Sequence, residues 1–208
     1  MSDRYDWVQA LREEIIESAE REYVGSIAEK VLREHFHSKE RISPLDPKDF
    51  FFAATAKVFY ADLGETNPLI VNYISELIGA QTLKSDSILK EKDLVLYEKM
   101  HKNISLDDMY PDANRAIGDL CLFNSGILRR HHNSEYMILM RKWFFDGKRK
   151  ETFREVLTEI GVASYKKALV FEEDEGKKEI LESMHGNFKD YSEGLNTLAY
   201  SYVYSKVI

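Results

Sequence analysis

The amino-acid sequence predicts an all-α fold, a single-domain bundle of about nine or ten helices with a long amphipathic helix at the C-terminus. Three observations favour this fold. The prolines fall where helices can begin, large apolar residues recur three and four positions apart near the C-terminus, and no Asn-Gly or Asp-Gly turn joins two alternating runs. We therefore expect no β-sheet, and one helical domain over residues 1–208.

Three prolines mark predicted helix starts. Asp46 precedes Pro47 and Asn67 precedes Pro68, so a side chain that can cap backbone N–H groups stands before a residue that needs no N–H in the first turn. Pro111 follows the same arrangement more loosely. These local signals predict helices that begin near residues 47, 68 and 111.

Residues 177–205 form the longest predicted helix. Its large residues recur at spacings of four or three, which places them on one narrow stripe at about 100° per residue. The stripe consists of Ile180, Met184, Phe188, Tyr191, Leu195, Leu198 and Tyr202. Because charged residues lie off the stripe, this helix is either the spine of the bundle or a surface that pairs with another chain.

Two further helical segments are predicted from their apolar faces. In residues 4–37 the apolar stripe changes face at Gly25, which predicts a kink or break there. Residues 116–128 carry one charge, Asp119, and are predicted to form a buried central helix. Gly64 is a predicted helix end, and residues 38–46 are a weak candidate for a domain boundary.

Composition excludes several classes of protein. Hydrophobic residues make up 44% and charged residues 31% of the chain, which is typical of globular domains and unlike disordered or fibrous proteins. No stretch is apolar enough to span a membrane, and the charged N-terminus contains no apolar signal-peptide core. Cys121 is the single cysteine, so no disulfide can form within the chain, and we expect a cytoplasmic protein.

Pairs of Glu and His three residues apart raise one enzymatic alternative. Glu-x-x-His is the spacing by which helical di-iron proteins hold metal ions, and it occurs at Glu34 and His37, Glu98 and His101, and Glu182 and His185. In each pair the side chains are predicted to point away from the apolar face where a core metal would sit. We therefore predict no cofactor, and a metal-dependent oxidoreductase with Fe, Mn or Zn at these six residues is the alternative.

Charge is segregated along the chain. The formal net charge is −7, yet residues 129–150 contain seven Lys or Arg against Glu135 and Asp146. Histidines and aromatic residues are interleaved with these cations: His131, His132, Tyr136, Trp143, Phe144 and Phe145. This basic-aromatic segment suits an acidic protein surface or a phosphate backbone. The structural alternative is a solvent-exposed helix face whose charge offsets acidic stretches of the same chain, such as residues 172–176.

The sequence lacks the familiar motifs of nucleophilic catalysis. Cys121 lies in an apolar run and is predicted to be buried rather than reactive. Neither a Gly-x-Ser-x-Gly motif nor a phosphate-binding glycine loop occurs. His35, the one histidine on an apolar face, is predicted to be a hydrogen-bonded core residue. Asp119 and Asn124 are the polar residues most expected to be buried, each with a partner.

Two short stretches match a pattern found in other helical proteins. Gly118-Asp119-Leu120-Cys121-Leu122-Phe123 with Gly126, followed by Gly161-Val162-Ala163-Ser164-Tyr165, resembles a family of uncharacterised bacterial all-helical proteins. Ser164 stands where that pattern has Ala. The resemblance implies a helical fold and carries no known activity.

These features together predict a non-enzymatic interaction or regulatory protein that presents the basic-aromatic segment to an acidic protein partner. The predicted contact residues are Arg129, Arg130, His131, His132, Arg141, Lys142, Lys148 and Arg149. Exposed parts of the longer helices offer a surface for a homodimer. Nucleic-acid binding through the same segment is a third alternative, and no contact with a membrane is expected.

Overall fold

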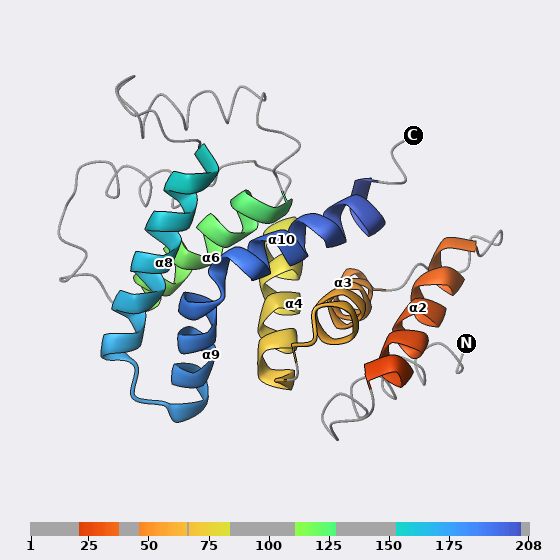
Figure 1. Cartoon of the computed structure of the whole chain (residues 1–208), viewed down its shortest axis with the longest axis horizontal. Helices are drawn as coiled ribbons and strands as arrows, with labels where there is room; N and C mark the ends of the chain where they lie inside the picture. Colours follow the sequence, from red (N-terminus) through yellow and green to blue (C-terminus); the bar gives the residue numbers. More distant parts are fainter. Residues whose placement is uncertain (1–20, 38–45, 66, 84–110, 128–152, 205–208) are drawn as a thin grey trace. The chain divides into compact units, whose positions relative to one another are not determined.

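A computed structural model describes residues 21–37, 46–65, 67–83, 111–127 and 153–204 of the chain. These residues form seven α-helices and two π-helical segments, with no strand among them, so the all-α prediction is confirmed for this part of the chain (Figure 1). The elements are α2 (Arg21–His37), α3 (Pro47–Thr55), η1 (Ala56–Asp62), α4 (Pro68–Leu83), α6 (Pro111–Gly126), α8 (Phe153–Phe171), α9 (Glu175–Gly186), α10 (Phe188–Leu198) and η4 (Ala199–Tyr204). The total number of helices stays a prediction.

The chain separates into two compact units. The first comprises Met1–Thr82 together with Thr197–Ile208, and the second comprises Leu83–Asn196. Each unit has buried apolar side chains of its own, such as Phe59 in the first and Leu122 in the second. The single-domain organisation remains a prediction. None of the helices in the described ranges is both long enough and apolar enough to cross a membrane.

The three proline-marked helix starts are confirmed. The Asp46 side chain accepts a hydrogen bond from the backbone N–H of Lys48 at 2.9 Å, and Asn67 Oδ1 accepts one from Leu69 N–H at 2.9 Å. Helix α6 begins at Pro111. These starts depend on neighbouring residues only, which is why local sequence predicts them well.

The first unit packs α2 against η1. A Cβ atom added to Gly25 would lie 2.8 Å from the Cβ of Ala61, so the glycine lets the two elements approach closely. Helix α2 continues through Gly25, so no break is found there, and the alternative of a kink at Gly25 stays a prediction. The chain leaves η1 at Gly64, whose φ of 77° suits glycine, which confirms the predicted helix end.

The second unit is built around α6. Ile117, Cys121 and Leu122 are fully buried, which agrees with the buried central helix predicted for residues 116–128. A Cβ atom on Gly118 would meet the ring of Tyr165, and one on Gly161 would meet the Cβ of Cys121. Because residue numbers rise along α6 as they fall along α8, the two helices run antiparallel, and the end of α6 lies toward the start of α8.

The predicted single helix over residues 177–205 is divided in the structure. Helix α9 ends at Gly186, Asn187 leaves helical geometry with φ −111° and ψ 20°, and α10 begins at Phe188 in a new direction (Figure 1). The apolar stripe is nonetheless buried at Met184, Phe188, Tyr191, Leu195 and Leu198. The regular spacing of the apolar residues continues across Asn187, so the spacing does not reveal that the helix ends there. The longest described helix is instead α8, with 19 residues.

Candidate functional site

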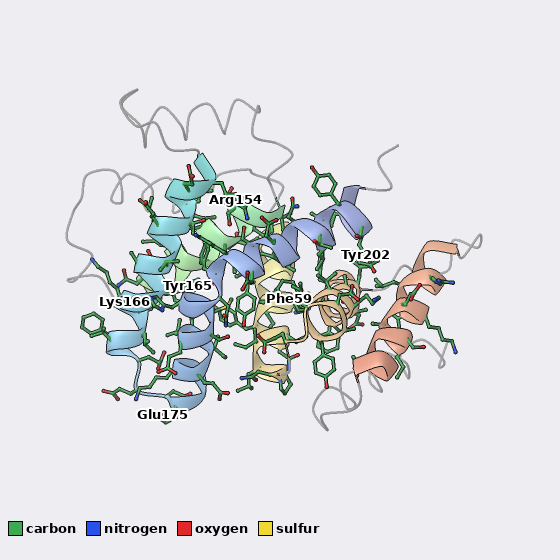
Figure 2. The ribbon with its side chains drawn as sticks, in the orientation of Figure 1. Phe59, Arg154, Tyr165, Lys166, Glu175 and Tyr202 are labelled. Atoms are coloured by element: carbon green, nitrogen blue, oxygen red, sulfur yellow. The ribbon has the colours of Figure 1, made fainter. Side chains whose placement is uncertain are left out.

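A hydrogen bond joins the two central helices of the second unit. The hydroxyl of Tyr165 on α8 donates to Oδ1 of Asp119 on α6 at 2.8 Å. Tyr165 is fully buried, and Figure 2 labels it on α8. Its ring packs against Phe188 with centroids 6.1 Å apart. Asp119, predicted to be a buried carboxylate with a partner, is half-buried and has that partner.

The glycines around this pair have a packing role. A Cβ atom on Gly118 would lie 2.7 Å from Cε1 of Tyr165, and one on Gly161 would lie 2.5 Å from Cζ of Phe188. The two halves of the Gly-Asp and Gly-x-x-x-Tyr pattern therefore meet in space, at the contact between α6 and α8. These residues join helices closely in the core, and their arrangement explains the spacing without any chemistry.

Cys121 is in a poor environment for a nucleophile. The side chain is completely buried on α6, and burial, followed by the charge of Asp119, raises the pKa of its thiol. Because the thiolate is the reactive form, this cysteine stays protonated and unreactive at neutral pH. The predicted burial of this thiol is confirmed, and its lack of a catalytic role stays a prediction.

A short polar network lies beside this cysteine. Asn124 is buried and donates from Nδ2 to the Leu120 carbonyl at 2.7 Å, as its predicted burial requires. Ser125 donates to the Leu122 carbonyl at 3.0 Å and accepts a hydrogen bond from Ser192 of α10 at 3.0 Å. These bonds give partners to the Asn124 Nδ2 group and to both serine hydroxyls, and they connect α6 to α10, which is a structural function.

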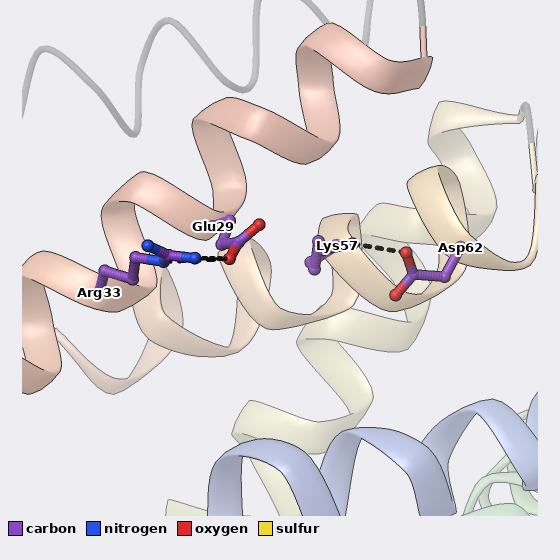
Figure 3. Close-up of polar contacts among 4 residues, drawn as sticks. All are labelled: Glu29, Arg33, Lys57 and Asp62. Atoms are coloured by element: carbon purple, nitrogen blue, oxygen red, sulfur yellow. Dashed lines mark hydrogen bonds and ion pairs between the residues drawn. The ribbon is translucent and has the colours of Figure 1, made fainter.

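An ion pair in the first unit depends on the π-helical winding of η1. Lys57 Nζ lies 2.5 Å from Asp62 Oδ1, five residues along the chain (Figure 3). In an α-helix, residues five apart lie about 140° apart around the axis. In a π-helix the backbone bonds join residues five apart, as Leu63 N–H to the Val58 carbonyl shows at 2.9 Å, so Lys57 and Asp62 share one side.

Two neighbouring elements add to the field around Lys57. The hydrogen bond to Asp62 raises the pKa of the Lys57 ammonium most, and Tyr202 of η4 and Glu29 of α2 raise it further. Glu29 also pairs with Arg33 at 2.5 Å (Figure 3). Burial raises the pKa of the Tyr202 phenol. At neutral pH the amine is therefore charged and the phenol neutral, so neither is primed as a nucleophile or base.

An acidic, partly apolar surface lies where α8 ends, and we call Val170–Glu175 the acidic-apolar turn. Val170 and Phe171 are 73% and 48% exposed, and Glu173, Asp174 and Glu175 are also exposed. Glu172 accepts hydrogen bonds from the backbone of Glu173 and Asp174, and Asp174 caps α9 by accepting from Lys177 N–H at 2.9 Å. The carboxylates of this turn are thus held by neighbouring backbone groups.

No protein-family model, curated protein or solved structure matches the chain. The resemblance to the bacterial helical family rests on the motif residues alone.

The residues of the metal alternative are only partly described. Glu182 of α9 is exposed and His185 is half-buried. Glu34 and His37 lie on α2, with no side-chain description, and Glu98 and His101 lie outside the described residues. Within the described ranges, no three His, Cys, Asp or Glu side chains gather as a metal would require. The metal-dependent oxidoreductase, with Fe, Mn or Zn, remains an untested alternative.

The predicted partner-binding residues all lie outside the described part of the chain. This holds for the whole basic-aromatic segment, residues 129–150, so their role stays a prediction. Two features of the described part escaped the sequence analysis. The Lys57–Asp62 pair was hidden by its five-residue spacing, which α-helical periodicity discounts. The exposure of Val170 and Phe171 was hidden because apolar residues at a helix end are normally assigned to the core.

Proposed function

We propose that this chain is a non-enzymatic cytoplasmic interaction protein that presents its basic-aromatic segment to an acidic protein partner. The observation that carries the proposal is the segregation of charge. Seven Lys or Arg stand within residues 129–150 of a chain whose net charge is −7. Trp143, Phe144 and Phe145 lie among these cations and add the aromatic area on which protein interfaces rely.

The local contacts of the acidic-apolar turn support this proposal. The alternative explanation of the basic segment is that it neutralises acidic stretches of its own chain, residues 172–176 in particular. In the described part of the chain, the side-chain hydrogen bonds and ion pairs of residues 172–175 all go to residues 173–178. Glu175, for example, pairs with Lys178 at 2.6 Å. Within one copy, the carboxylates of the turn contact only neighbouring described residues, and this supports a partner on another chain.

The state of the described reactive groups supports a non-enzymatic role as well. Burial holds the Cys121 thiol in its protonated form, and Asp62 holds Lys57 as an ammonium ion. The Asp119 carboxylate and the Tyr165 hydroxyl are hydrogen-bonded to each other in a packed contact between two helices. Each of these groups therefore contributes to packing or pairing in the described units.

Charge reversal tests the proposal. The variant Arg129→Glu, Arg130→Glu, Lys148→Glu, Arg149→Glu is compared with the wild type for binding of a fluorescent polyglutamate peptide, followed by fluorescence anisotropy at low salt. We expect at least a tenfold loss of affinity, because the electrostatic attraction becomes repulsion. Wild-type binding weakens as salt is added, since the exposed charges are screened.

A matched control has the same number of reversals elsewhere: Lys48→Glu, Lys166→Glu, Lys177→Glu and Lys189→Glu, all at exposed positions. This variant changes net charge equally, so it should retain most of the peptide affinity. Equal loss in both variants, or no loss in the first, would contradict the proposal. Tighter binding of an oligodeoxythymidylate than of polyglutamate would instead favour the nucleic-acid alternative.

A further inference from the structure

The acidic-apolar turn places exposed apolar side chains directly beside negatively charged ones. Val170 and Phe171 are adjacent large apolar residues that are 73% and 48% exposed at the end of α8. Isolated exposed apolar residues are common and need no explanation. Here, however, they are followed directly by four carboxylates, Glu172 to Glu175. An apolar contact flanked by negative charge is the complement of a segment that mixes aromatic residues with Lys and Arg.

The negative charge of the turn is only partly compensated. Glu175 pairs with Lys178, and the pKa of Lys178 is raised first by Glu175 and also by Glu172 and Glu173. Glu172 and Asp174 accept hydrogen bonds from neutral backbone N–H groups, which leaves their charge in place. Glu173 is exposed and forms no side-chain ion pair with the described residues. The turn therefore keeps a net negative field beside its two apolar side chains.

We propose that the acidic-apolar turn is the docking site for the basic-aromatic segment of a second copy of this chain. The inference rests on the proposed function and names the acidic partner. Charge complementarity supports it, because the segment has seven Lys or Arg where the turn has four carboxylates. Apolar complementarity also supports it, because Trp143, Phe144 and Phe145 of the segment match Val170 and Phe171 of the turn.

The length of α8 argues for a second copy over the same copy. The helix runs from Phe153 to Phe171, which at 1.5 Å per residue separates its start from the turn by about 27 Å. Lys148–Lys150 stand three to five residues before Phe153, so at most about 18 Å of extended backbone links them to the start of α8. Their backbone therefore stays at least about 9 Å from Phe171 of the same chain.

The cations at the other end of the segment also stand close in sequence to a described helix end. Arg129 and Arg130 follow Ile127 by two and three residues, a span of at most about 11 Å. The end of α6 lies toward the start of α8, because Gly118 faces Tyr165 while Cys121, further along α6, faces Gly161. Five of the seven cations thus stand within five residues of the described ends at Ile127 and Phe153. Docking between two copies satisfies both surfaces, and a reciprocal pair closes as a dimer.

Sedimentation velocity of the full chain tests this proposal. We expect a wild-type dimer at low salt that dissociates at high salt, with a dissociation constant that rises about tenfold or more as the charges are screened. Glu173→Lys with Glu175→Lys in the turn, and Lys148→Glu with Arg149→Glu in the segment, should each give a monomer. Mixing these two variants should restore the dimer, because the exchanged charges attract again. Phe171→Ser should weaken the dimer without any change of charge.

The control reverses two exposed acidic residues elsewhere, Glu76→Lys and Glu182→Lys, and should remain a dimer. A wild type that is monomeric at every concentration, a turn variant as dimeric as the wild type, or a mixture that stays monomeric would overturn the docking proposal. Polyglutamate binding separates its failure from that of the proposed function. If the wild type is monomeric but binds polyglutamate through residues 129–150, the docking proposal is wrong and the proposed function still holds. If the segment variant binds the peptide as tightly as the wild type, the proposed function is wrong.

Discussion

The Tyr165 hydroxyl of α8 donates a hydrogen bond of 2.8 Å to the Asp119 carboxylate of α6. The donor is fully buried and the acceptor is half-buried. A hydrogen bond between a buried donor and a carboxylate is stronger than one on the surface, and loss of either partner removes that bond from the other.

Removing the Tyr165 hydroxyl should destabilise the second unit. We expect Tyr165→Phe to lower the free energy of unfolding by about 1–2 kcal/mol, since Asp119 loses a buried donor. Urea denaturation followed by circular dichroism measures the change. A double-mutant cycle with Asp119→Ala should give a coupling of about 1 kcal/mol, and a coupling near zero would show that the two side chains do not act as a pair.

A methyl group at Gly118 should also destabilise the second unit. Its Cβ atom would lie 2.7 Å from Cε1 of the fully buried Tyr165 ring, so the ring or the helix would have to shift. We expect Gly118→Ala to lower the free energy of unfolding by about 1–3 kcal/mol. Gly79→Ala in α4 is the matched control, because nothing lies within 4 Å of its added Cβ atom. It should be neutral or stabilising by up to about 1 kcal/mol, and equal losses in both variants would refute the steric explanation.

Cys121 should react slowly with thiol reagents in the folded protein. Burial raises the pKa of its thiol above the ordinary 9.0, so raising the pH from 7 to 9 should hardly increase the native reaction rate with a disulfide reagent. The unfolded chain ionises near 9.0 and should react quickly.

The same shift affects stability at high pH. Above pH 9.0 the unfolded state releases the thiol proton while the folded state keeps it, so stability falls as the pH rises. Cys121→Ala should remove that part of the pH dependence. A native thiol that titrates like a free cysteine would show that the site is accessible.

The Lys57–Asp62 pair should make a small contribution to stability. The side chains are 21% and 48% exposed, so Lys57→Met should lower the free energy of unfolding by about 0.5–1 kcal/mol at low salt. Because Asp62 raises the pKa of Lys57 above 10.5, the contribution is complete below pH 10.5 and is lost as the pH rises through the raised value. Denaturation at pH 7 and above pH 11 checks both points. Lys178→Met, in a more exposed pair, should have a smaller effect, and a larger one would contradict the burial argument.

Features that depend on neighbouring residues were predictable from the sequence. Asp46 and Asn67 cap helices because the capping side chain and the proline are adjacent. Met184 of α9 and Phe188 and Leu195 of α10 are buried, as their apolar spacing in the sequence predicts. Asp119 was a predicted site of buried polar contact, and its half-buried bond to Tyr165 agrees with that expectation.

Features that depend on distant residues were not predictable in the same way. The partner of Asp119 stands 46 residues along the chain, and only the packing of α8 on α6 brings it near. Helix α9 ends before Asn187, yet the apolar residues keep the same spacing before and after it, so the spacing does not predict the break. The π-helical winding of η1 shows its effect only in contacts such as Lys57 with Asp62. The proposed partner contacts lie outside the described residues and remain untested.

The winding of η1 has a consequence for the whole of residues 56–62. The same residues rewound as an α-helix would carry Asp62 about 140° around the axis from Lys57, and the ion pair would be lost. The ion pair therefore favours the π-helical winding of residues 56–62 over the α-helical winding. A change of winding there would also rotate the residues that follow η1 about its axis, together with the turn at Gly64 that leads into α4. A contact between two surface charges in this way helps to set the angular register of the next helix.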